Sequence, residues 1–434
     1  MKNILALFSF LISTHLLAAE DSSKLRAPLL QLYEHLHSHP ELSLKENETA
    51  KLLASELRKL GLKVQERFGG TGVVAVYSNG EGPNILIRAD SDALPIAEET
   101  GLAYASHRHQ LDSSGMDVPV MHACGHDVHM TVLMGTVEKL LQQKDQWHGT
   151  LIVVLQSAEE KGMGALQLLD AGLYQKFPRP HYNIALHVAA DLPAGQVGYT
   201  SGYAMANVDS VDITVYGEGG HGAAPQKTKD PIVLASQLVL ALQTIVSREI
   251  PPTEPAVVTV GSIHGGSQHN IIGNEVKLQL TLRSYSLEVR QQILAAIKRI
   301  SRGLALAAGL PEQKMPLIEV QKNFTPSVYN DPALTQRASK VFSSLLGEQS
   351  VKALPPVMVG EDFGQYGLVE PRIPSLIFWL GSIGEKRYQE AQKQRKQLPT
   401  LHSSSYYPDA AKTLATGISS MTALAIELFQ KPKD

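Results

Sequence analysis

The run Leu151-Ile152-Val153-Val154-Leu155-Gln156 is a continuous apolar segment, and the polar stretch Ser157-Ala158-Glu159-Glu160 follows it at once. Unbroken apolar runs of this length are typical of strands that are buried on both faces of a sheet. Strand-like and helix-like segments alternate around it, and they span residues 25–39, 46–60, 73–77, 84–89, 129–142 and 183–187. This alternation predicts an α/β domain in which helices flank a mixed sheet.

The pattern changes near residue 200. Polar and apolar residues then alternate as in half-exposed strands, and two long helix-like segments interrupt them in the order β-α-β-β-α. This order predicts a compact α+β, ferredoxin-like domain over residues 200–308. A chain of 434 residues is long for a single hydrophobic core, so we expect the α/β domain to comprise residues 20–199 and 309–434, with the smaller domain inserted between them.

The composition excludes several classes of partner. Hydrophobic residues make up 43% and charged residues 19% of the chain, as in a globular protein, and the formal net charge is -3. Lysine and arginine are scattered, so no basic surface for nucleic acid or for a membrane is expected. We therefore expect a small-molecule partner.

The first nineteen residues differ from the rest of the chain. Lys2 precedes an apolar run over residues 4–17, and small residues follow it at Ala18-Ala19. This pattern predicts a secretory signal peptide over residues 1–19, with a buried N-terminal helix as the simpler alternative. We expect an exported protein of bacterial type, either periplasmic or secreted.

The single cysteine of the chain, Cys124, lies within the stretch Met121-His122-Ala123-Cys124-Gly125-His126-Asp127-Val128-His129. A thiolate and an imidazole two residues apart can reach one metal centre from a turn, and Gly125 permits a tight bend between them. Asp127 is expected to orient a ligand imidazole. A single histidine is usually structural, but three within nine residues beside a cysteine favour a metal site.

Two pairs of carboxylates follow predicted strands. Glu159 and Glu160 come after the apolar run, and Asp90 and Asp92 come after the strand-like segment 84–89. In open α/β sheets, ligands gather at the carboxyl ends of strands, where one carboxylate can bind metal and another can take a proton from water. The glutamates are otherwise a solvated first turn of a helix. The aspartates either orient metal ligands or are ordinary turn residues.

Isolated polar residues complete the candidate set. His187 ends the strand-like segment 183–187 and so lies at the same edge of the sheet, whereas His402 lies far along the chain. Three residues of the smaller domain either aim hydrogen-bond donors at a substrate or are turn and surface residues: His221, Asn270 and Arg283.

The chain resembles the M20 metallopeptidase family, in particular its amidohydrolase branch of hippurate hydrolases, N-acyl-amino-acid amidohydrolases and plant auxin-conjugate hydrolases. The matching stretches run in family order across nearly the whole chain: Arg88-Ala89-Asp90-Ser91-Asp92-Ala93-Leu94-Pro95, Met121 to His129, Ala158-Glu159-Glu160, Leu186-His187, Gly220-His221-Gly222-Ala223-Ala224-Pro225, Gly360-Glu361-Asp362-Phe363 and Leu401-His402. One departure is Ser157, where proline is expected.

The resemblance implies a catalytic domain that holds two divalent metals and a lid domain that forms a homodimer. It implies that Glu159 is the general base and that His221 stabilises the oxyanion, within one chain or across the dimer. Asn270 and Arg283 would hold polar groups of the substrate. The metal ligands would be Cys124, His126, Glu160, His187 and His402, with Cys124 bridging the metals.

The residues fit more than one metal and more than one class of substrate. Mixed nitrogen, oxygen and sulfur ligands suit Zn, and Mn, Co or Ni fit as well. The resemblance implies hydrolysis of the amide bond of an N-acyl amino acid or a related small amide. The alternatives are a two-metal dipeptidase or carboxypeptidase that acts on small peptides, and a non-catalytic metal-binding protein on the same fold.

Overall fold

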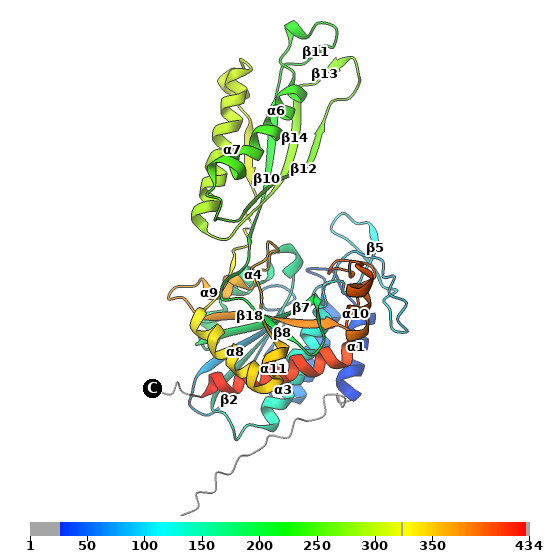
Figure 1. Cartoon of the computed structure of the whole chain (residues 1–434), viewed down its shortest axis with the longest axis vertical. Helices are drawn as coiled ribbons and strands as arrows, with labels where there is room; N and C mark the ends of the chain where they lie inside the picture. The colour runs from blue at the N-terminus through cyan, green and yellow to red at the C-terminus, as the bar shows by residue number, and fades with distance from the viewer. Residues whose placement is uncertain (1–26, 323, 431–434) are drawn as a thin grey trace, which may run out of the picture.

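The computed structural model describes residues 27–322 and 324–430 (Figure 1). The predicted signal peptide lies outside these residues. The described chain forms a larger α/β unit and a smaller α+β unit that projects from it (Figure 1).

The larger unit is built on an eight-stranded mixed sheet with the strand order β1-β2-β6-β3-β7-β18-β8-β17. The quoted apolar run forms β6, which pairs antiparallel with β2 and parallel with β3. The parallel set continues through β7 and β18. These strands are β1 (Lys63–Gln65), β2 (Val73–Asn79), β3 (Asn84–Asp90), β6 (Gly149–Gln156), β7 (Tyr182–Pro193), β8 (Val197–Tyr199), β17 (Val351–Ala353) and β18 (Ser375–Ile383).

Helices cover both faces of this sheet, as the sequence predicts. One hydrophobic cluster joins the sheet to side chains of α1, α2, α3, α8 and α11, and another joins it to α4, α5 and α9. The helices of the larger unit are α1 (Ala27–Ser38), α2 (Asn47–Lys59), α3 (His126–Gln142), α4 (Gly164–Asp170), α5 (Leu173–Lys176), α8 (Pro332–Leu346), α9 (Gly364–Gly367), α10 (Glu385–Gln394) and α11 (Ala410–Phe429).

The smaller unit has a four-stranded antiparallel sheet in the order β12-β14-β10-β15, with α6 and α7 packed on one face. Alternate residues of β10 and β14 are buried against these helices, which explains the alternation seen in the sequence. Its elements are β10 (Asn207–Tyr216), β11 (Gly220–His221), α6 (Pro231–Thr244), η3 (Ile245–Glu249), β12 (Ala256–Gly265), β13 (Ile271–Ile272), β14 (Glu275–Ser284), α7 (Leu287–Ala307) and β15 (Leu317–Val320).

The element order β-α-β-β-α-β is that of a ferredoxin-like fold. Its last strand lies beyond residue 308, where the sequence placed the end of the inserted domain. Because β15 pairs with β10 over Leu317 to Val320, the smaller sheet extends past that boundary.

Two connections join the units, and they run side by side. Val208 and Thr325 exchange backbone hydrogen bonds of 2.8 and 3.2 Å between nitrogen and oxygen. Close to them, β9 (Gly202–Met205) pairs with β16 (Val328–Asn330). The remaining strands, β4 (His109–Leu111) and β5 (Asp117–Pro119), form a separate hairpin.

One helical stretch of the described residues, Pro231–Glu249, is long and apolar enough to cross a membrane by length and composition alone. It packs on the smaller sheet through Leu234, Leu238 and Leu242, and 33% of its apolar window is buried. Several of its outer side chains are exposed, among them Val233 and Leu240.

Candidate active site

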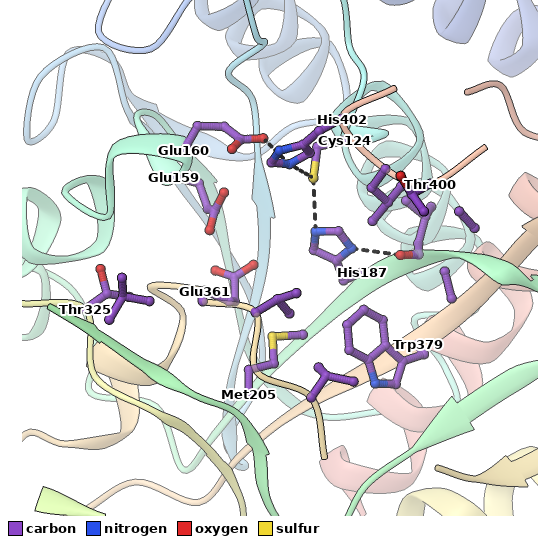
Figure 2. A pocket seen from close by; sticks show the side chains of 18 of the residues that line it. Cys124, Glu159, Glu160, His187, Met205, Thr325, Glu361, Trp379, Thr400 and His402 are labelled. Carbon is purple, nitrogen blue, oxygen red and sulfur yellow. Dashed lines mark hydrogen bonds and ion pairs between the residues drawn. The ribbon is translucent and has the colours of Figure 1, made fainter. Parts of the chain in front are cut away.

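The candidate residues of the larger unit meet at the carboxyl edge of its sheet, and Figure 2 shows five of them: Cys124, Glu159, Glu160, His187 and His402. The strands β3 and β6 end at Asp90 and Gln156, two residues before Asp92 and three residues before Glu159, and β7 carries His187. Cys124 and His126 lie at the start of α3, and His402 lies in the loop before α11. Because these strands are parallel, residues that are far apart in the sequence share one edge.

The two glutamates sit on a short 3-10 turn, η1 (Glu159–Lys161), rather than on a solvated helix. The Asp92 carboxylate accepts from the amide of Glu159 at 3.1 Å and from the amide of Glu160 at 3.0 Å. Glu159 is buried, and 11% of the Glu160 side chain is exposed. The solvated-helix interpretation is therefore wrong.

Gly125 allows the chain to bend before α3. Its φ is +76°, and a Cβ there would lie 2.6 Å from the Cγ2 of Val188. The bend places the Nδ1 of His126 2.7 Å from the carbonyl oxygen of Asp92, so Nδ1–H donates, and in the neutral ring Nε2 carries the lone pair.

The buried Nε2 of His126 has no hydrogen-bond partner among the described residues. Carboxylate oxygens surround it at 3.7 Å (Asp90), 3.9 Å (Glu159) and 3.9 Å (Glu160). A lone pair that faces carboxylates in a buried site is a favourable environment for a cation.

Cys124 lies between two imidazoles (Figure 2). Its Sγ is 3.5 Å from the Nε2 of His187 and 3.2 Å from the Nε2 of His402. The Nδ1 of His187 donates to the carbonyl of Val188 at 2.8 Å, which leaves its Nε2 directed at the sulfur. The Nε2 of His402 is also 3.4 Å from Glu160 Oε1.

These donors fall into overlapping groups whose ligand atoms all lie within 4.8 Å of one another. Cys124, His126 and His187 form one group, and Cys124, Glu160 and His402 form another. The thiol belongs to both, so the donor set fits two metal ions that share a sulfur ligand.

The pKa shifts of these side chains also fit a site that binds cations. Burial, and then the charges of Glu361 and Glu160, raise the pKa of Glu159 well above its usual range. Burial lowers the pKa of His126, but the charges of Asp90 and Asp92 outweigh it and raise that pKa to about 10. Burial and the charges of Glu160 and Glu159 raise the pKa of the Cys124 thiol. Bound cations would displace these protons.

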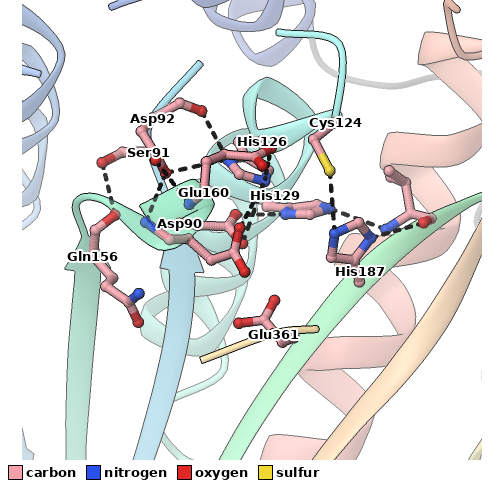
Figure 3. A network of polar contacts seen from close by, with 12 residues as sticks. Asp90, Ser91, Asp92, Cys124, His126, His129, Gln156, Glu160, His187 and Glu361 are labelled. Atoms are coloured by element: carbon pink, nitrogen blue, oxygen red, sulfur yellow. Dashed lines mark hydrogen bonds and ion pairs between the residues drawn. The ribbon is translucent and has the colours of Figure 1, made fainter. Parts of the chain in front are cut away.

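Neighbouring residues fix the orientation of the donors (Figure 3). The amide of Val188 donates to the Nε2 of His129 at 3.0 Å, so the His129 Nδ1–H donates to Asp90 at 2.6 Å. Both nitrogens of His129 are thereby used, and it is no candidate ligand. Asp90 also accepts from Arg88, whose guanidinium binds Glu361 and Asp362 as well.

The expected role of Asp127 is wrong. Its carboxylate binds the Nδ1 of His37 at 2.7 Å and the amide of Val128 at 2.8 Å, and no candidate ligand imidazole is among its hydrogen-bond partners. The backbone carbonyl of Asp92 orients His126 instead. The sequence did not point to His37 or to Glu46, which binds the turn before Glu159.

A cavity of about 890 Å³ opens between the two units over these donors. Arg283 of β14 lines it, and its Nη1 donates to the carbonyl of Met358 at 2.9 Å. No described carboxylate forms an ion pair with Arg283, and burial lowers the pKa of its guanidinium. A half-buried cation in a cavity of this size suits an anionic group of a small ligand.

His221 and Asn270 do not line this cavity. Both are exposed at the small two-stranded β11–β13 sheet at the far end of the smaller unit (Figure 1), where the Gly222 amide donates to the Asn270 carbonyl at 2.8 Å. One chain therefore brings Arg283 to the site, but neither of these two residues.

Comparison with known proteins identifies the family to which the chain belongs. The model of peptidase family M20/M25/M40 matches residues 86–402, a range that contains every candidate donor. The chain belongs to the M20 peptidase family. It is a hydrolase, and its mixed sheet with an inserted smaller unit is the arrangement of this family's structures.

Several M20 relatives resemble it over most of their length. N-acetyl-L-cysteine deacetylase of Bacillus subtilis is 34% identical over 403 residues, which is 90% of this chain and 89% of the relative. An IAA-amino acid hydrolase (ILR1-like 4) of Arabidopsis thaliana is 33% identical over 83% of this chain and 78% of its own. Bacillus subtilis YXEP, a dinuclear metal-binding M20 peptidase of known structure, is 28% identical with a TM-score of 0.72, over 92% of this chain and 97% of its own.

Proposed function

We propose that this M20 hydrolase cleaves the amide bond of N-acyl amino acids with the help of two divalent cations. The observation that carries the proposal is the pair of donor groups that share Cys124, with the buried Glu159 beside them. The proposed ligands are Cys124, His126, Glu160, His187 and His402.

When bound there, two cations lower the pKa of a water molecule and polarise a substrate carbonyl. Glu159 takes the proton of that water and later passes it to the leaving nitrogen. Its position suits this double task, because Glu159 is buried beside the donors and is not one of the proposed ligands.

Arg283 is proposed to hold the carboxylate of the substrate. Its guanidinium is half-buried, lines the cavity and lacks an ion-pair partner among the described residues. A blocked amino acid has a carboxylate but no free amine, and the names of the Bacillus deacetylase and the Arabidopsis hydrolase describe substrates of this kind. An N-acyl amino acid is therefore favoured over an unblocked dipeptide.

A peptidase activity is the second candidate. Thermostable carboxypeptidase 1 of Saccharolobus solfataricus is 34% identical over 83% of this chain and 87% of its own. A panel of hippurate, N-acetyl amino acids, an indole-acetyl conjugate and free dipeptides separates the two candidates. Cleavage of blocked amino acids that a chelator abolishes supports the proposal, whereas cleavage of dipeptides alone supports the peptidase. Loading with Zn, Mn, Co or Ni identifies the working metal.

A homodimer is proposed to complete the site. On α6, Leu240 is 72% exposed and Val233 54%, and Ile263 of the edge strand β12 is 50% exposed. Exposed apolar side chains beside an unpaired sheet edge suit a second copy of this chain. A dimer through this face would let His221, and with it Asn270, serve the partner's cavity.

The dimer has a direct test. Mixing His221→Ala subunits with Glu159→Gln subunits restores activity if one site uses both chains, and mass measurement in solution shows the assembly. Failure of complementation in a proven mixed dimer contradicts the shared site. Export to the periplasm or medium is proposed from the signal peptide that the sequence predicts over residues 1–19, and cell fractionation tests it.

A further inference from the structure

Glu46 is a buried carboxylate that lies just before α2 and has no assigned role in the proposed chemistry. Its Oε1 accepts from the amides of Leu44 and Ala158, each at 2.9 Å. Its Oε2 accepts from the hydroxyl of Thr71 at 2.5 Å. No described lysine, arginine or histidine forms an ion pair with it, so its contacts are to neutral donors.

The amide that Glu46 holds belongs to a strained residue. Ala158 has φ +52° and ψ 38°, a left-handed conformation that is sterically unfavourable for an L-residue with a Cβ atom. It is fully buried, and its carbonyl accepts from the amides of Met163 and Gly164, each at 3.2 Å. The next two residues are Glu159 and Glu160. The backbone direction at Ala158 therefore sets where both carboxylates point.

Two buried carboxylates thus accept hydrogen bonds from three consecutive backbone amides. Glu46 accepts from Ala158, and Asp92 accepts from Glu159 and Glu160. Backbone strain persists only where the surroundings over-determine it. Without an acceptor at Glu46, the Ala158 amide would be buried and unpaired, and relaxation to negative φ would turn Glu159 and Glu160 away from the cavity.

We propose that Glu46 is a positioning residue, which holds Ala158 in its left-handed conformation and so aims Glu159 and Glu160. The inference rests on the proposed function for the roles of these two glutamates. Glu46 acts as a hydrogen-bond acceptor and not through its charge. Glutamine can do the same, because its carbonyl oxygen can accept from both amides while its amide group donates to Thr71.

The test compares Glu46→Leu, Glu46→Gln and the double variant Glu46→Leu/Ala158→Gly. Turnover and KM are measured on an N-acyl amino acid that the wild type cleaves. Zinc affinity of the metal-free protein is measured by competition with a coloured chelator. Glu41→Leu is the matched control, because Glu41 is also buried in the same segment but accepts from the amides of Glu48 and Thr49 instead.

We expect Glu46→Leu to lower kcat about 10- to 100-fold with little change in KM, and to weaken zinc binding. Glu46→Gln should stay within about threefold of wild type, since it keeps both acceptor contacts. Glycine adopts positive φ without strain, so the added Ala158→Gly should restore much of the lost turnover. Glu41→Leu should lower thermal stability and leave turnover per loaded site unchanged.

Three results would overturn the inference: wild-type turnover and zinc affinity in Glu46→Leu, a glutamine variant as slow as the leucine variant, or no recovery in the double variant. Failure of the proposed function looks different. If Glu159→Gln kept full activity, the base would be wrong, while the zinc affinities would still decide whether Glu46 aims Glu160.

Discussion

Asp92→Asn offers a prediction whose size can be worked from the structure. The carboxylate is buried, with Oδ1 accepting from the Glu159 amide and Oδ2 from the Glu160 amide and the Ser43 hydroxyl. Burial would raise the pKa of Asp92, but contacts with His126 outweigh it and lower that pKa. The native group is therefore a charged acceptor for two amides.

Asparagine has only one side-chain oxygen. In either orientation its NH₂ group faces one of the two backbone amides, so one charge-assisted hydrogen bond is lost and one amide is left unpaired. Losing a hydrogen bond to a charged group costs about 1.5–3 kcal/mol of free energy. If this cost is added in full to the activation free energy, kcat drops by roughly 10- to 150-fold, because each 1.36 kcal/mol changes the rate by a factor of ten.

The assay is steady-state hydrolysis of an N-acyl amino acid by protein of measured metal content. Ser43→Ala is the control, because it removes the 2.6 Å contact to Oδ2 and leaves both amide contacts in place. It should be affected much less than Asp92→Asn. A fully metal-loaded Asp92→Asn enzyme with kcat within twofold of wild type would show that the two amide contacts do not support turnover.

Three further predictions follow from the surrounding network. Arg88→Met leaves Asp90, Glu361 and Asp362 buried without their cation, which should destabilise the fold by about 3–5 kcal/mol in thermal or urea unfolding; an unchanged midpoint would contradict this. Burial lowers the pKa of His37, but hydrogen bonds to Asp127 and Glu98 outweigh it and raise that pKa from 6.5 to about 10. The resulting stabilisation of the folded state is complete below pH 6.5 and is lost as the pH rises toward 10. The difference in unfolding free energy between wild type and His37→Gln should therefore shrink across that range. A difference that stays constant would argue against a charged His37. Cys124→Ser should lower metal content and activity together, and elemental analysis that found full loading would remove Cys124 from the ligand set.

The sequence predicted the parts of the site that local pattern encodes. The continuous apolar run of β6 indicated a central strand, and the carboxylates after it indicated the functional edge of the sheet. Cys124 and His126 are two residues apart on either side of a glycine bend, so their spacing alone places them together. The alternation in β10 and β14 likewise predicted the smaller sheet.

Contacts between distant segments were not predictable in the same way. Glu46 reaches Ala158 across 112 positions, and it stands among other glutamates at the start of a helix, where such residues are common. Asp127 follows His126 directly, which suggested a partnership. Successive side chains in a helix point about 100° apart, so Asp127 turns to His37 instead. The four-residue strand β15 is too short to show a period.

The most direct test of the central claim is a metal titration of chelator-stripped enzyme, with hydrolysis of an N-acyl amino acid measured at each step for wild type and Glu159→Gln. We predict that activity reaches its maximum only at two equivalents of metal. We also predict that Glu159→Gln binds two equivalents while its turnover is lower by about 10²- to 10⁴-fold. Full activity with one equivalent or none, or full activity in Glu159→Gln, would contradict these predictions.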